Sequence, residues 1–197
     1  ESGILEICEK KLKDIESFTK VESIKSKINT LDLWESWITL RSKSIYYDTI
    51  NMNIKDTSEM TAQAIWEFEK GSKINEENIK KAINQKLSCL NQVNKIFEEY
   101  DFLALPSAQV YPFDKKLQYP EYINGEKLDT YHRWLEVFVL SSLLELPTIT
   151  VPVGFNKNGL PMGMQIIARK KDDLKLIAFV KKYEEIFKFS KIKHKLN

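Results

Sequence analysis

The residues most able to do chemistry in this chain are two histidines, two cysteines and many serines and lysines. A hydrolase that works through a nucleophile needs a serine or cysteine beside a positioned base, usually histidine or lysine. His132 lies between Tyr131 and Arg133 in a predicted helix, and His194 lies in a basic tail. Neither forms a readable Ser-His-Asp arrangement, so we expect His132 to have a surface or hydrogen-bonding role.

Two segments match the pattern Ser-x-x-Lys, namely Ser17–Lys20 and Ser190–Lys193. In penicillin-binding enzymes this spacing places the lysine one helical turn from a nucleophilic serine. The companion motifs Ser-Asp-Asn and Lys-Thr-Gly are absent, and a chain so rich in lysine is expected to contain such matches by chance. The pattern therefore does not indicate a catalytic site.

The cysteines and acidic residues point to packing and capping rather than to a cofactor. Cys8 and Cys89 lie on or beside apolar faces of predicted helices, where a buried, inert thiol is usual. Two cysteines and two histidines without short spacings do not form a recognisable zinc site. Asp172 and Asp173 stand at a predicted helix start, where capping explains them better than acid–base chemistry. We expect no metal and no cofactor.

The composition is that of an ordinary globular protein, with 43% hydrophobic and 29% charged residues and a formal charge of +2. Only three residues are arginine, so the clustered basic face and arginine forks typical of nucleic-acid binding are not indicated. No apolar run reaches the roughly 18 residues of a membrane helix, so no membrane association is predicted. Two unrelated cysteines favour a reducing compartment, and a cytoplasmic location is expected.

A shift in composition divides the chain near residue 100. All six prolines lie between Pro106 and Pro161, and the first hundred residues contain none. This predicts a mainly helical part, 1–100, a mixed part, 101–189, and a tail, 190–197. Apolar spacing predicts a first helix that ends near Ser17 and a short strand at Lys20–Ile24. Three more helices are expected. The first begins with Thr30 as its cap, and the second covers Thr57–Lys70 and ends at Gly71 in a left-handed conformation. The third runs from the cap Asn75 to Tyr100.

The mixed part is predicted to run strand, helix, strand, strand, helix. Phe102–Leu105 forms a strand that Pro106 keeps out of a sheet interior. The β-branched stretch Thr148–Val153 and the segment Met164–Ala168 predict two strands joined by a turn. A last helix follows the cap Asp172.

Between the first two strands we expect a helix that Asp129 or Thr130 caps and that reaches Leu144. Trp134 and Glu136 point inward from it, and it runs directly into a buried strand. An aromatic residue in such a place packs in the core or lines a pocket.

Four ordered segments carry a resemblance to a known family. They are Tyr100–Gln109 (YDFLALPSAQ), Thr130–Trp134 (TYHRW), Leu146–Gly154 (LPTITVPVG) and Gly159–Gln165 (GLPMGMQ). Together they resemble the C-terminal portion of amidase-signature enzymes, a family that includes bacterial amidases, the tRNA amidotransferase A subunit and fatty acid amide hydrolase. Glu145 stands where the family usually has glycine, which predicts a local difference at that helix end.

The resemblance implies an α/β protein with part of a mixed β-sheet flanked by helices. It also implies hydrolysis of carboxylic amides through an acyl-enzyme. In the family a lysine, a serine on a cis peptide and a nucleophilic serine form the catalytic triad, and all three belong to the N-terminal half. This sequence has no Gly-Gly-Ser-Ser segment. We therefore assign no catalytic residue here and expect residues 1–197 to form a single incomplete domain.

The C-terminal half of the family helps to enclose the substrate. On that basis the resemblance implies four pocket candidates, which are Gln109, Tyr131, Trp134 and Glu136. The implied partners are a small-molecule amide and the N-terminal half of the enzyme, as fragment or partner chain, with a homo-oligomer also open. Two alternatives stay open, a non-catalytic interaction protein that uses the 79–100 helix as a partner surface and an amidotransferase subunit. Without a covering partner, we expect the Thr148–Val153 strand to expose an apolar edge and the chain to associate.

Overall fold

The structure is a computed structural model that describes residues 1–54 and 60–192. Its contacts divide the chain into two compact units, one of Glu1–Ser26 with Ile96–Asn197 and one of Lys27–Lys95. The first contains all the described strands, and the second is helical. The predicted α/β class is confirmed, and helices flank the main sheet.

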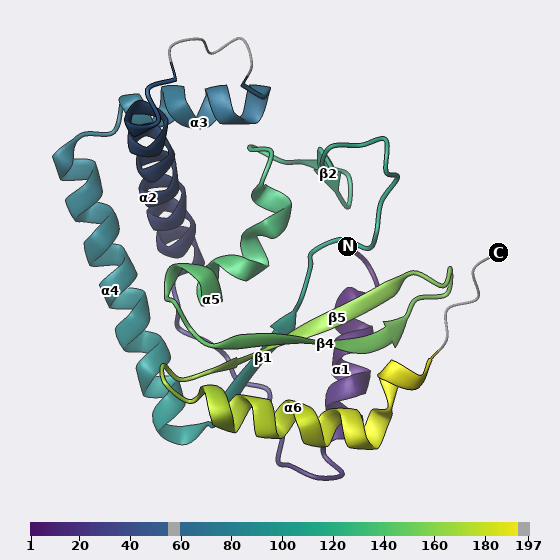
Figure 1. Ribbon diagram of the computed structural model, residues 1–197. Coiled ribbons are helices and arrows are strands. Elements are labelled where there is room, and N and C mark those ends of the chain that lie inside the picture. The colour runs from purple at the N-terminus through teal and green to yellow at the C-terminus, as the bar shows by residue number, and fades with distance from the viewer. Residues whose placement is uncertain (55–59, 193–197) are drawn as a thin grey trace. The chain divides into compact units, whose positions relative to one another are not determined.

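The main sheet has three strands in the order β1-β5-β4 (Figure 1). They are β1, Phe102–Pro106; β4, Thr148–Phe155; and β5, Pro161–Ala168. Both pairings are antiparallel, with Phe102 opposite Ala168 and Thr148 opposite Ile167. Pro106 ends β1 at one side of this sheet, as predicted, because a proline cannot donate a ladder hydrogen bond from a central strand. β4 forms the other side of the described sheet.

The hairpin between β4 and β5 follows the turn predicted from Asn158 and Gly159. Gly159 has φ 78, and the Asn156 side-chain oxygen accepts hydrogen bonds from the backbone N–H groups of Asn158 and Leu160, both at 2.9 Å. β4 extends two residues beyond the predicted end at Val153, through a register shift between Pro152 and Gly154. Gly154 has φ 138, so the bulge uses the freedom of glycine.

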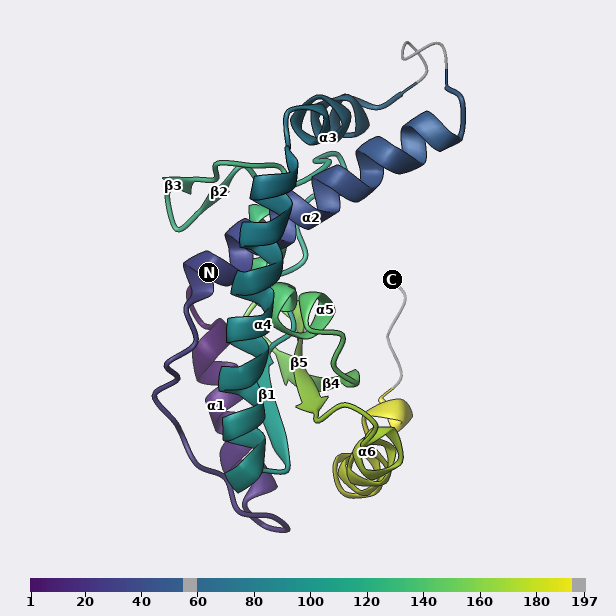
Figure 2. The same ribbon diagram turned by 90° about the vertical axis from the view of Figure 1, so that its left-hand side faces the viewer.

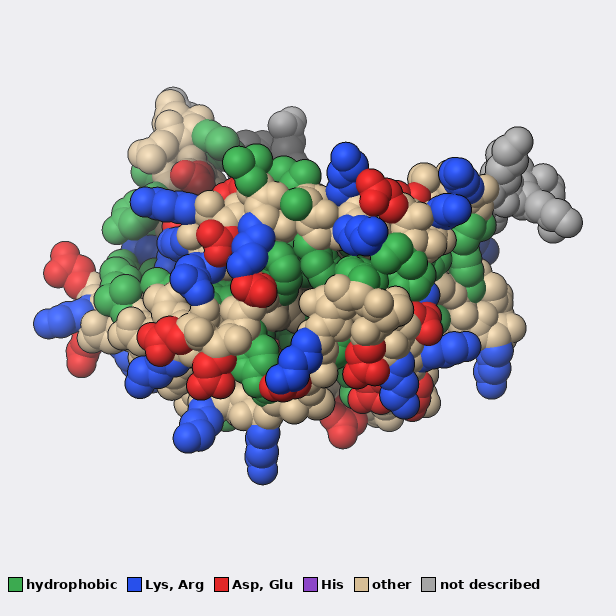
Figure 3. Space-filling model, turned by 90° about the horizontal axis from the view of Figure 1, so that it is seen from below, with side chains coloured by type: hydrophobic (Ala, Val, Ile, Leu, Met, Phe, Trp, Pro, Cys, Tyr) green, Lys and Arg blue, Asp and Glu red, His purple; other side chains and the backbone are tan. Residues whose placement is uncertain are grey.

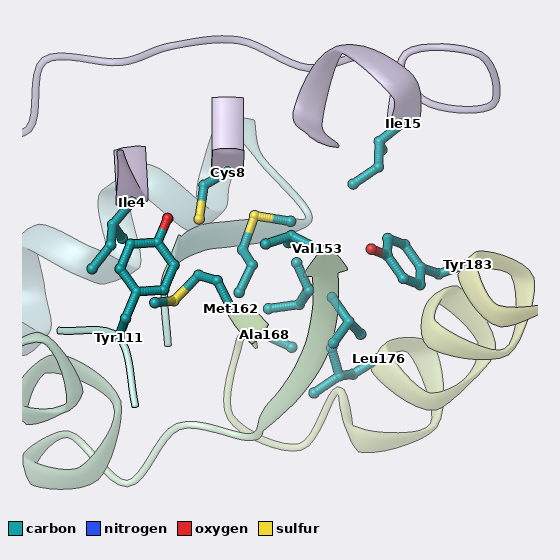
Figure 4. Close-up of a cluster of buried hydrophobic side chains, with 12 residues drawn as sticks. Ile4, Cys8, Ile15, Tyr111, Val153, Met162, Ala168, Leu176 and Tyr183 are labelled. Carbon is teal, nitrogen blue, oxygen red and sulfur yellow. The ribbon is translucent and has the colours of Figure 1, made fainter. Parts of the chain in front are cut away.

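Two helices cover one face of this sheet, α1 (Ile4–Ile15) and α6 (Asp173–Phe187). Their buried side chains meet those of β4 and β5 in the core shown in Figure 4. The Tyr183 hydroxyl donates a hydrogen bond to the Pro152 carbonyl oxygen at 2.5 Å and ties α6 to β4. Asp172 occupies the N-cap position of α6 as predicted, although its side chain makes no capping hydrogen bond. The short 3-10 turn η3 (Phe189–Lys191) follows α6.

A short helical segment that ends in α5 (Val139–Leu143) lies on the opposite side of the sheet from α6, as Figures 1 and 2 show. The continuous helix predicted up to Leu144 is wrong. The chain instead forms the 3-10 helix η2 (Arg133–Phe138) and then the five-residue α5 (Val139–Leu143). Side chains distant in the sequence, Gln109 and Gln165, hydrogen-bond to the Val137 peptide inside η2, and a local helical pattern contains no sign of these contacts.

The predicted strand at Lys20–Ile24 is also wrong, since these residues have no strand assignment. A strand needs a neighbour that completes its ladder of hydrogen bonds, and the described strand pairings give this segment none. Side chains hold it instead. Glu22 pairs with Lys20 and accepts a hydrogen bond from the Tyr100 hydroxyl at 2.7 Å.

The second unit contains α2 (Thr30–Asn51), α3 (Ala62–Ser72) and most of α4 (Glu76–Glu99). Asn29, not Thr30, caps α2, because its side-chain oxygen accepts from the backbone of Leu31 at 3.1 Å. Asn75 caps α4 as predicted, and its side-chain oxygen accepts from the Asn78 N–H at 2.9 Å. The predicted start of the third helix at Thr57, with Asp56 and Glu59, lies outside the described residues. The described helix begins after Thr61, whose hydroxyl accepts from the Ala64 N–H at 3.3 Å.

A buried carboxylate and a close helix contact hold α2 and α3 together. Glu67 is 1% exposed and accepts hydrogen bonds from the Ser42 hydroxyl at 2.5 Å and from Arg41 Nε at 2.9 Å. Gly71 does not take the predicted left-handed conformation and lies inside α3. A Cβ atom on Gly71 would lie 2.1 Å from the Ser42 carbonyl oxygen, so this glycine permits the close approach of the helix backbones.

Figure 3 views the molecule from below, the side on which α6 lies in Figure 1, and shows acidic and basic side chains interspersed with apolar ones. Within residues 1–54 and 60–192, no helix is long and apolar enough to cross a membrane.

Candidate functional site

A polar cavity of about 410 Å³ lies in the first unit between η2 and the hairpin of β2 (Tyr122–Ile123) and β3 (Glu126–Lys127). Gln109 and Glu136, two of the four predicted pocket residues, line it together. Its other walls are Ile123, Asn124, Glu126, Lys127, Leu128, Asp129 and Arg133. The walls carry three carboxylates and two cations, which makes the cavity polar with a small excess of negative charge.

A row of three charged side chains forms one wall of the cavity. Arg133 Nε and Nη2 donate hydrogen bonds to the two carboxylate oxygens of Asp129 at 2.8 and 2.6 Å. Arg133 Nη1 lies 3.1 Å from Glu136 Oε1. Arg133 and Glu136 lie one above the other, because they are three residues apart in the 3-10 helix η2, whereas Asp129 lies in the segment before η2.

The bidentate pair changes the acidity of both partners. The hydrogen bonds from Arg133 hold the pKa of Asp129 below its ordinary value, against the opposing effect of partial burial. The hydrogen bonds to Asp129 likewise raise the pKa of Arg133. Arg133 therefore stays charged and is held between two carboxylates, where it orients Glu136.

The hairpin that closes the other side of the cavity was not predicted from the sequence. Its strands are β2 (Tyr122–Ile123) and β3 (Glu126–Lys127), joined by Asn124 and Gly125. Both turn residues have positive φ, 51 and 83. Asn-Gly is the strongest short hairpin signal, because both central residues of a type I′ turn need this conformation. That dipeptide is the signal that could have found this wall.

Tyr131 and Trp134, the other two predicted pocket residues, pack against aromatic neighbours. The Tyr131 ring stacks on the His132 ring with centroids 4.3 Å apart, and the Trp134 ring meets Phe113 edge to face at 5.5 Å. Their role as substrate contacts stays a prediction. His132 is 2% exposed, and its Nδ1 lies 2.8 Å from the Thr130 hydroxyl, in agreement with a hydrogen-bonding role.

The two cysteines are free and buried. Burial raises the pKa of the Cys8 thiol to about 11, and burial also raises the pKa of Cys89. Both thiols thus lack nucleophilic character near neutral pH. Among the described residues, no group of three or more histidine, cysteine or acidic side chains is arranged to hold a metal ion.

The cavity walls can bind polar groups but hold no nucleophile beside a base. Amide, carboxylate, ammonium and guanidinium groups can donate to and accept from a polar ligand. The described walls include no serine, cysteine or histidine. The arrangement therefore suits recognition of a ligand rather than covalent catalysis by these residues.

A family model described as Amidase matches residues 11–177. The chain belongs to the amidase-signature family. The match spans the last part of α1, the sheet and the whole cavity, so the cavity is part of the region the family shares. Enzymes of this family are amide hydrolases.

Curated relatives of this amidase-family chain include the glutamyl-tRNA(Gln) amidotransferase subunits A of Borreliella afzelii (strain PKo) and Thermodesulfovibrio yellowstonii (strain ATCC 51303 / DSM 11347 / YP87). The first is 35% identical over 88 residues, which is 45% of this chain and 17% of the relative. The second is 32% identical over 117 residues, which is 58% of this chain and 22% of the relative. The aligned part of this chain thus spans about a fifth of the length of these relatives.

Solved structures show the same fold. A bacterial aryl acylamidase of the amidase-signature family superposes with a TM-score of 0.84 at 20% identity, over 96% of this chain and 41% of the other. A 6-aminohexanoate cyclic dimer hydrolase in complex with its substrate gives a TM-score of 0.80 at 13% identity, over 99% of this chain and 43% of the other. The fold of this chain therefore corresponds to less than half of each of these proteins.

Proposed function

We propose that this chain is the C-terminal part of an amide hydrolase, which converts a carboxylic amide to a carboxylate and ammonia or an amine. The match of the Amidase family model over residues 11–177 is the observation that carries this proposal. In it, residues 1–197 form one incomplete domain that supplies scaffold and part of the substrate pocket. The acyl-enzyme would form on a Ser-cisSer-Lys triad located upstream of this chain, and this chain alone would be inactive.

The polar cavity is the proposed substrate wall. Gln109 and Glu136 would bind polar atoms of a small amide, and Tyr131 and Trp134 would supply the aromatic part of the same wall. The placement of Gln109 and Glu136 in one cavity supports this role. Because the cavity walls carry one more carboxylate than cations, a neutral or cationic amide would fit better than an anionic one.

The proposed partner is the N-terminal half of the enzyme, in the same molecule or as a separate chain. β4 forms one side of the described sheet, and the described strands pair with it on its β5 side alone. A further strand there would complete the ladder and cover the apolar edge, and a homo-oligomer could cover the same edge. The free thiols of Cys8 and Cys89 are consistent with a cytoplasmic enzyme.

A subunit of an amidotransferase is the second candidate. The curated relatives named above are A subunits of such enzymes, and this observation favours it over a non-catalytic interaction protein. The two candidates share the amide-hydrolysing step. They differ in whether the released ammonia leaves the protein or is passed to a second substrate.

The test is ammonia release by the intact protein that contains this chain. A panel of neutral, cationic and anionic carboxylic amides is supplied, and the turnover of each is compared with that of the 197-residue chain alone. We expect turnover only with the intact protein, reduced at least about tenfold in Glu136→Gln, because a charged hydrogen-bond partner is lost. Glu185→Gln, an exposed position on α6, is the matched control and should keep full activity.

Two results would overturn the proposal. The first is an upstream sequence without a lysine and a glycine- and serine-rich segment. The second is an intact protein that releases neither ammonia nor an amine from any primary or secondary amide of the panel, with or without added acceptor, which would leave the interaction protein as the better description.

A further inference from the structure

Two glutamine side chains hold one peptide of the cavity wall from both sides. The backbone N–H of Val137 donates to Gln109 Oε1 at 3.0 Å, and the carbonyl oxygen of Val137 accepts from Gln165 Nε2 at 2.9 Å. Val137 directly follows Glu136, so this clamp acts next to a cavity residue. Gln109 is itself a wall of the cavity, whereas Gln165 lies in β5 beneath it.

Gln165 is the better fixed of the two. It is 0% exposed, and its Nε2 also donates to the Pro106 carbonyl oxygen at 3.0 Å. Its Oε1 accepts from the Ser141 hydroxyl at 3.1 Å. An inverted amide would place Oε1 against two carbonyl oxygens, which only accept hydrogen bonds, so the orientation of the side chain is determined. One buried amide thereby joins β5, the end of β1, η2 and α5.

The clamp acts on a peptide inside the 3-10 helix of residues 133–138. In either kind of helix, the N–H and the carbonyl of Val137 would bond to main-chain groups three or four residues away. Here both groups also meet glutamine side chains. The backbone before them makes short-range hydrogen bonds, as from the Leu135 N–H to the His132 carbonyl oxygen at 2.9 Å. Side chains from β5 and from the loop after β1 thus fix the position of the Val137 peptide.

The helix type decides where Glu136 points. A 3-10 helix turns about 120° per residue and an α-helix about 100°. The rotation over three residues therefore differs by about 60° between the two helix types. In the 3-10 form, Glu136 lies above Arg133, with the two side chains 3.1 Å apart at Oε1 and Nη1. In an α-helix Glu136 would stay on the same face as Arg133 but would be offset from it by about 60° around the helix axis, which would change its place in the cavity wall.

We propose that Gln165 is a positioning residue of the cavity, which keeps Glu136 and Arg133 in register by fixing the position of the Val137 peptide. The ligand-binding part of this inference rests on the proposed function, but the conformational part does not. Gln165 touches no ligand in this scheme and acts through Val137.

The experiment compares Gln165→Met with Ile167→Val in the 197-residue chain. Methionine is close to glutamine in shape but makes none of its three hydrogen bonds. Ile167 is the next-but-one residue of β5, is 0% exposed, and controls for a loss of packing in the same strand. Hydrogen exchange of the amides of residues 133–138 is measured against those of β4 and β5, and binding of glycinamide, a cationic primary amide, is followed in parallel.

In Gln165→Met we expect the Val137 amide to exchange about tenfold faster relative to the β4 and β5 amides, and glycinamide to bind about tenfold more weakly. Ile167→Val should change exchange evenly over both regions. If Gln165→Met does not fold, the same exchange measurement is made on Gln109→Leu. This variant removes the other hydrogen bond of the clamp, from the Val137 N–H to Gln109 Oε1. Equal exchange at Val137 in these variants and in the control would overturn the inference.

The outcomes separate this inference from the proposed function. If Gln165→Met shows the local exchange effect, but neither the chain nor the intact protein binds or hydrolyses an amide, the role of Gln165 stands and the proposed function fails. A chain that binds glycinamide equally well in wild type and Gln165→Met, with unchanged exchange at Val137, keeps the proposed function and loses this inference.

Discussion

Replacing Gly71 by alanine tests the closest helix contact of the second unit. A Cβ atom at this position would lie 2.1 Å from the Ser42 carbonyl oxygen and 2.6 Å from the Tyr46 Cβ. The first of these is a backbone atom of α2, so a change of side-chain rotamer cannot remove the clash. The two helices must move apart.

The size of the effect follows from three contributions. Alanine gains about 1 kcal/mol over glycine in a helix. Overpacking costs about 1–3 kcal/mol. Moving the helices apart also weakens the hydrogen bond from Ser42 to buried Glu67, and such a bond to a charged group contributes about 1.5–3 kcal/mol. We therefore expect Gly71→Ala to lower the free energy of unfolding by about 2–4 kcal/mol.

Urea unfolding followed by tryptophan fluorescence measures this change. Trp34, Trp37 and Trp66 lie in the second unit, so the signal reports mainly on it. Ser72→Ala, at the next and exposed position of α3, is the matched control and should stay within about 0.5 kcal/mol of wild type. A Gly71→Ala protein as stable as wild type or more stable would refute the close contact between α2 and α3.

Three further predictions concern the rest of the chain. Glu145 has φ 55, so Glu145→Gly should be about 1 kcal/mol more stable than Glu145→Ala. Both variants lose the glutamate side chain, and only glycine relieves the left-handed strain. Equal midpoints of urea unfolding for the two variants would contradict this. The raised pKa of Cys8, about 11 against an ordinary 9.0, means that its contribution to stability is complete below about pH 9 and is lost as the pH rises toward 11. The stability of wild type should therefore fall relative to Cys8→Ala across that window, and a constant difference between the two would count against it. Glu67→Ala should lower the free energy of unfolding by about 3 kcal/mol, because it leaves the fully buried Ser42 hydroxyl without its acceptor. A loss below about 1 kcal/mol, measured by calorimetry, would be incompatible with that burial.

The elements that could be predicted are those whose pattern is local. α1, α4 and α6 repeat apolar residues at helical spacing, and the caps and turns at Asn75 and Gly159 depend on neighbours within a few residues. β1, β4 and β5 could be placed because proline and β-branched residues mark their ends and interiors. Local physics was sufficient for these parts.

Gly71 and Glu145 show where local reasoning ends. At both positions the sequence-based expectation relied on the preference of glycine for special backbone geometry. The structure gives a different reason at each. Gly71 has ordinary helical geometry and is needed because α2 passes close by. Glu145 takes the left-handed conformation in spite of its side chain, at the place where the resemblance expects glycine. A sequence pattern does not distinguish a glycine that is needed for its dihedral angles from one that is needed for its missing Cβ.

The candidate site was predicted in part. The resemblance named Gln109 and Glu136, and the structure places both in one cavity. The sequence predicts Asp129 or Thr130 as a helix cap, whereas the structure shows Asp129 as the bidentate partner of Arg133. The Asn124-Gly125 turn was readable from the sequence, but the cavity that it helps to close was not, because its walls come from three separate segments.

The sequence by itself indicated the family through its ordered motifs, and it predicted α1, α4, α6 and the three strands of the main sheet, because periodicity and turn residues are local features of the chain. Only the tertiary structure decided the shape of the cavity wall. The amides of Gln109 and Gln165, each 28 residues away from Val137, hold the Val137 peptide from both sides. No pattern within the helix itself contains those hydrogen bonds, so the direction of Glu136 follows from the fold.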